Sequence, residues 1–79
     1  MSSLRRKTPK IVLTFATTSD AMALEAAARD RGLPGRMIPV PSELSASCGL
    51  AWCIPVEEWS TFQQFTEARY EGKFELELY

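Results

Sequence analysis

The chain has 79 residues, of which 46% are hydrophobic, and a formal net charge of −1. This length and composition fit a single globular domain, which we expect to fold without a cofactor, a metal or a disulfide framework. The chain contains no histidine, which excludes the usual general base and the Cys/His nucleophile pair, and its low net charge argues against nucleic acid or an anionic membrane surface as a partner.

The first nine residues are predicted to form a separate leader. Residues 1–9 contain the basic cluster Arg5, Arg6 and Lys7 and are predicted to be disordered, with a single domain over residues 10–79. The apolar run that follows is too short for the hydrophobic region of a signal peptide or for a membrane span. We therefore expect a cytoplasmic protein whose two cysteines are free thiols.

The first half of the domain predicts a strand, a helix and a second strand. Residues 10–15 are β-branched and apolar, as in a buried strand. The sequence Thr-Thr-Ser-Asp at 17–20 offers capping side chains for a helix over 21–31, which ends at Gly32. Residues 36–40 predict a short strand, and the proline within it favours an edge of the sheet.

The second half predicts a strand, a helix and a last strand. Residues 50–54 alternate large and small side chains, which is typical of a strand. A helix is predicted from Pro55 to Gly72, with aromatic core residues at a spacing of three. Residues 74–78 alternate apolar side chains with glutamates, which predicts a strand whose glutamates face solvent.

The order βαββαβ predicts an α+β fold, the ferredoxin-like sandwich, with two helices on one face of a four-stranded antiparallel sheet. Right-handed crossovers then place the third strand between the first two. The start of the third strand, near Cys48, would lie at the same sheet edge as the N-terminus of the first helix. Cys48 and residues 17–19 are therefore predicted to be neighbours.

Cys48 is the main candidate functional residue. It lies among prolines, serines and other small residues at 39–51, which oppose regular pairing and predict an accessible thiol. The positive end of the helix would favour its thiolate. The predicted site also includes serine and threonine hydroxyls and the backbone amides of a glycine turn, namely Ser45, Ser47, Gly49, Thr17 and Thr18.

Cys53 is interpreted as a packing residue because it lies inside the apolar third strand. Five residues of extended chain from Cys48 span roughly 16 Å, so a direct disulfide would require a sharp bend. Cys53 would be a resolving thiol only if Cys48 lay on a mobile loop.

The residues leave open three reactions of the thiol and one assembly role. A nucleophilic thiol can accept a sulfur atom as a persulfide, attack a disulfide or be oxidised to a sulfenic acid as a redox sensor. Alternatively, the sheet pairs with another copy of the chain, as a homodimer, or with another protein, and Cys48 is incidental.

The run Pro-Val-Pro at 39–41, followed by Leu-Ser-Ala-Ser-Cys-Gly-Leu-Ala at 44–51, resembles the selenium/sulfur carrier protein-like family of short bacterial proteins. The alanine-rich helix that opens with Thr-Thr at 17–18 and carries Glu25 agrees with it. The resemblance extends from about residue 10 to residue 51.

This resemblance implies that Cys48 carries sulfur or selenium as a persulfide or selenopersulfide, between a donor protein and an acceptor protein. Such a protein is a carrier more than a stand-alone enzyme. Ser42 stands where many relatives have a basic residue, and Arg36 and Arg69 are the candidates to replace that charge.

Overall fold

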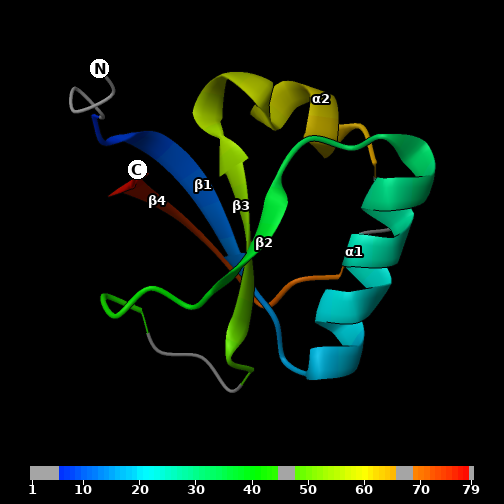
Figure 1. Ribbon diagram of the computed structural model, residues 1–79. Coiled ribbons are helices and arrows are strands. Elements are labelled where there is room, and N and C mark those ends of the chain that lie inside the picture. Colours follow the sequence, from blue (N-terminus) through cyan, green and yellow to red (C-terminus); the bar gives the residue numbers. More distant parts are fainter. Residues whose placement is uncertain (1–5, 45–47, 66–68, 79) are drawn as a thin grey trace.

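The computed structural model describes residues 6–44, 48–65 and 69–78 (Figure 1). Four strands form one antiparallel sheet in the order β2-β3-β1-β4. The elements along the chain are β1 (Thr8–Thr14), α1 (Thr18–Arg31), β2 (Arg36–Pro39), β3 (Leu50–Pro55), a 3-10 turn (Val56–Glu58), α2 (Trp59–Gln63) and β4 (Gly72–Leu78). The predicted α+β fold with a ferredoxin-like arrangement is confirmed, including the place of β3 between β1 and β2.

The sheet begins earlier than predicted. β1 starts at Thr8, so the last residues assigned to the leader belong to the sheet. Pro9 is tolerated in this strand because β3 pairs with β1 only from Lys10 onward, and β4 alone lies beside Pro9. Residues 1–5 of the predicted leader lie outside the described residues.

α1 ends at Gly32 as the sequence predicts, but it begins at Thr18, three residues before the predicted start. The N-cap residue Thr17 accepts a hydrogen bond through Oγ1 from the backbone N–H of Asp20, at 3.1 Å. Gly32 ends the helix in the left-handed conformation, with φ of 69°. No helix in the described part of the chain is long and apolar enough to pass through a lipid bilayer.

Replacing Thr17 by alanine removes the cap acceptor and is expected to lower the free energy of unfolding by about 1 kcal/mol. Urea denaturation followed by circular dichroism measures this change. Ser19→Ala is the control, because Ser19 is exposed in the same turn and does not act as the N-cap. Equal losses in the two variants would contradict the capping role of Thr17.

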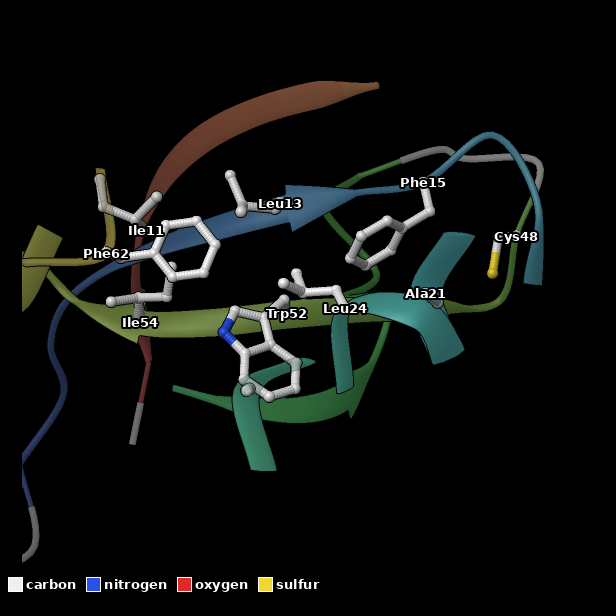
Figure 2. Packing of buried hydrophobic residues seen from close by; sticks show 10 residues of the cluster. Ile11, Leu13, Phe15, Ala21, Leu24, Cys48, Trp52, Ile54 and Phe62 are labelled. Carbon is white, nitrogen blue, oxygen red and sulfur yellow. The ribbon is translucent and has the colours of Figure 1, made fainter. Parts of the chain in front are cut away.

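The hydrophobic core lies between one face of the sheet and both helices (Figure 2). The strands β1 and β3 present every second side chain to this face. The buried cluster consists of Ile11, Leu13, Phe15, Ala21, Leu24, Ala28, Cys48, Trp52, Ile54 and Phe62. Because α1 and α2 both contribute to it, the described part of the chain places no helix on the opposite face of the sheet, which is called the helix-free face below.

The second helix is shorter than predicted. α2 ends at Gln63 rather than near Gly72, and Gly72 is the first residue of β4. A Cβ atom on Gly72 would lie 2.9 Å from Oγ1 of Thr14 on the neighbouring strand, so this glycine permits close packing within the sheet. Phe62 nevertheless packs in the core as predicted, with 1% of its surface exposed.

The last strand turns its apolar side chains away from the helices. Val12 pairs with Phe74 and Lys10 pairs with Leu76, and side chains alternate along a strand. Phe74, Leu76 and Leu78 therefore lie on the helix-free face, and Phe74 is 40% exposed. The glutamates of β4 are exposed, as predicted, but they share the side of the sheet on which the helices lie.

Candidate functional site

Cys48 lies just before β3, at the end of the core cluster where Phe15 and Ala21 also lie (Figure 2). Its Sγ atom is 3.7 Å from Oγ1 of Thr18, the first residue of α1. This contact joins residues that are 30 positions apart in the sequence. The sheet topology therefore brings Cys48 to the N-terminus of α1, as predicted.

The backbone N–H of Leu50 donates a second hydrogen bond to Sγ of Cys48, at 3.4 Å. Leu50 is the first residue of β3, so the bend that leads into this strand turns its amide toward the sulfur. Every residue except proline carries such an amide, and no sequence pattern could have identified Leu50 as a donor. A sulfur anion at this position would be stabilised by the amide and by the Thr18 hydroxyl.

The expectation of an accessible thiol is wrong. Cys48 is 3% exposed and belongs to the hydrophobic core. Its side chain lies on the same side of the sheet as Trp52 and Ile54, which pack under the helices. The combination of burial with two polar contacts nevertheless distinguishes this cysteine from one that only packs.

The other predicted site residues contribute unequally. Ser45 and Ser47 lie outside the described residues. The Thr17 hydroxyl serves as the helix cap, and Gly49 is exposed, with its carbonyl oxygen accepting a hydrogen bond from the backbone N–H of Val40 at 3.1 Å. Of the predicted hydroxyls that the structure describes, that of Thr18 lies against the sulfur.

The two candidate basic residues lie at different places in the fold. Arg36 is opposite Cys53 on the helix-free face, so the sheet separates it from the cluster that holds Cys48. Arg69 lines a surface hollow with Ala16 and Asp20, which border the start of α1. Arg69 is therefore the better placed of the two to supply a charge near the N-terminus of α1.

Cys53 is buried on the helix-free face, as its interpretation as a packing residue predicts. It is 4% exposed and pairs with Val12 of β1 and Arg36 of β2. Burial raises the pKa of the Cys53 thiol, and the positive charges of Lys10 and Arg36 act in the opposite direction. Cys53 therefore remains protonated at neutral pH.

No intramolecular disulfide is expected between Cys48 and Cys53, which are both free. Their side chains lie on opposite faces of the sheet, and the strand between them spans roughly 16 Å, whereas disulfides need Cα atoms within about 7 Å. Treatment with diamide, followed by peptide mapping without reduction, tests this expectation. A peptide pair cross-linked within the monomer would contradict it.

The fold and the site define a small α+β protein that holds one thiol against the N-terminal turn of a helix. The chain matches the family described as Putative Se/S carrier protein-like over residues 10–72, and it belongs to this family. The match extends beyond the resemblance found in residues 10–51 and includes β3 and α2. No curated protein and no solved structure matches the chain.

Proposed function

We propose that this protein carries sulfur or selenium on Cys48, as a persulfide or selenopersulfide, from a donor protein to an acceptor protein. The observation that carries the proposal is that two hydrogen-bonding groups meet one sulfur atom. Sγ of Cys48 accepts from the Leu50 amide and contacts the Thr18 hydroxyl at the N-terminus of α1. This arrangement suits a sulfur anion, and the membership in the family supports the same function.

The transfer steps are thiol exchange reactions. The Cys48 thiolate attacks the terminal sulfur of a donor persulfide, a new S–S bond forms at Cys48, and the donor cysteine leaves as a thiolate. An acceptor thiolate then attacks the terminal sulfur on Cys48 and restores the Cys48 thiolate. No external oxidant is required because each S–S bond that breaks is replaced by another.

The burial of Cys48 has a consequence for both steps. With 3% of its surface exposed, the sulfur cannot meet a donor protein unless the chain around it moves outward. The interior position would protect a loaded sulfur from water and from small thiols between encounters. We propose that partner binding drives this opening.

The proposal is tested by incubating the protein with a cysteine desulfurase and free cysteine, followed by intact-mass analysis and peptide mapping. A gain of one sulfur atom on Cys48 is expected, reversible by a reducing agent. The absence of any gain would contradict the carrier function. A gain of oxygen on Cys48 under mild oxidant, without stable persulfide, would instead favour a redox-sensing thiol.

A second candidate function is that of an assembly module in which Cys48 is incidental. It is favoured by the exposed Phe74, which lies beside Leu76 and Leu78 on the helix-free face. This face would pair with another copy of the chain or with another protein. Light scattering at increasing protein concentration tests for a homodimer. This function would be favoured if a dimer forms, if Phe74→Ser abolishes it, and if the protein accepts no sulfur.

A further inference from the structure

A pocket on the helix-free face of the sheet is separate from the site at Cys48. It has a volume of about 290 Å³ and is lined by Lys10, Gly35, Arg36, Cys53 and Pro55. We propose that this pocket binds a small, doubly charged tetrahedral oxyanion such as sulfate or phosphate. The proposal does not depend on the carrier function of Cys48.

The strand register brings two cations to one buried thiol. Arg36 of β2 lies directly opposite Cys53 of β3, and Lys10 of β1 lies opposite Pro55. Since side chains two positions apart share a face, Lys10 and Arg36 flank Cys53 from two different strands. Both residues line the pocket together with Cys53, and their positive charges lower the pKa of its thiol against the effect of burial.

Neither positive charge is neutralised within the described part of the chain. The Nζ atom of Lys10 donates to Oγ1 of Thr8 at 2.8 Å, which is an uncharged partner, and Arg36 is exposed. The acidic residues of β4, Glu75 and Glu77, lie on the other face of the sheet by alternation. Lys10 and Arg36 are therefore the only charged strand residues on the helix-free face in the described ranges.

The pocket is lined by the buried thiol of Cys53. Cys53 is 4% exposed, and its sulfur has no hydrogen-bond partner among the residues that the structure describes. The backbone at Gly35 packs against β3, where a Cβ atom would lie 2.9 Å from the Cys53 carbonyl oxygen, with φ of 112°. The wall beside the thiol is thus backbone held close to the sheet, not a flexible side chain.

These features suit a tetrahedral dianion better than a single carboxylate. The two positive charges of Lys10 and Arg36 match the two negative charges of the anion. The planar guanidinium of Arg36 offers paired N–H donors and the ammonium group of Lys10 offers three more, so that several oxygens of one anion can be bound at once. The protonated Cys53 thiol adds a weak donor to the lining of the pocket.

The test is a titration of the full chain with sodium sulfate and with sodium phosphate, at constant ionic strength maintained with sodium chloride. Amide chemical shifts from NMR are expected to change saturably at Lys10, Arg36 and Cys53. Arg36→Gln and Lys10→Gln are each expected to weaken binding by about tenfold or more, because each removes a charge-assisted hydrogen bond.

Arg69→Gln is the matched control, because it removes the same charge at an exposed residue in a different surface hollow. It is expected to leave the affinity unchanged. An equal loss in Arg69→Gln would show general charge attraction and would overturn the proposal, as would the absence of saturable shifts. Since these measurements do not involve sulfur loading, their failure is distinct from a failure of the carrier function.

Discussion

Cys48→Ser is expected to abolish sulfur loading, whereas Cys53→Ser is expected to load as the unmodified protein does. A serine hydroxyl cannot form an S–S bond, and Cys48 is the thiol with two hydrogen-bond contacts, from the Leu50 amide and the Thr18 hydroxyl. Cys53 has a raised pKa through burial, so little of it is thiolate at neutral pH. The measurement is the transfer of sulfur from a desulfurase, followed by intact-mass analysis.

The two serine variants control for each other, because both replace a buried thiol in the same strand region. Circular dichroism and thermal unfolding establish that each variant is folded before loading is compared. Loading of Cys48→Ser at the level of the unmodified protein would refute the assignment of Cys48. Loss of sulfur loading in Cys53→Ser alone would show that Cys53, on the helix-free face, is the residue that carries sulfur.

Phe62→Ala is expected to remove a large share of the free energy of unfolding. Phe62 is 1% exposed, stacks on Trp59 with ring centres 5.6 Å apart and meets the edge of Phe65 at 6.4 Å. Removal of a buried phenylalanine costs about 3–5 kcal/mol, whereas a chain of 79 residues has a total stability of about 4–12 kcal/mol. Urea denaturation at equilibrium measures the loss.

Phe74→Ala is the matched control, because it makes the same change at a side chain that is 40% exposed. Its cost is expected to be about 1 kcal/mol. A large loss in Phe74→Ala with a small loss in Phe62→Ala would mean that the core lies on the other face of the sheet. That result would contradict the packing of α2 described above.

Much of the fold follows from local chemistry that is visible in the sequence. The Thr17 cap, the left-handed Gly32 and the proline in the edge strand β2 each depend on one residue type at one place. The order of elements then gives the ferredoxin-like arrangement through the handedness of the crossovers. The proximity of Cys48 to Thr18 follows in turn, without any long-range pattern in the sequence.

The sequence predictions are wrong or incomplete where packing between neighbouring elements determines the structure. The alternation in β4 correctly predicts exposed glutamates, but it does not show whether they lie on the helix side or on the helix-free side of the sheet. The pairing of Phe74 with Val12 places the apolar side chains on the helix-free face. α2 is also shorter than the predicted helix, because the aromatic spacing indicates a core-facing helix but not where that helix ends.

From the sequence alone came the fold class, the C-terminal end of α1, the family and the choice of Cys48, because each of these depends on residue types and their order. Only the tertiary structure decided that the Cys48 sulfur is buried, that the Leu50 amide donates to it, and that Lys10 and Arg36 flank Cys53. The physical reason is that burial and hydrogen bonding at a given atom depend on strand register and helix packing. These bring together residues that are far apart along the chain.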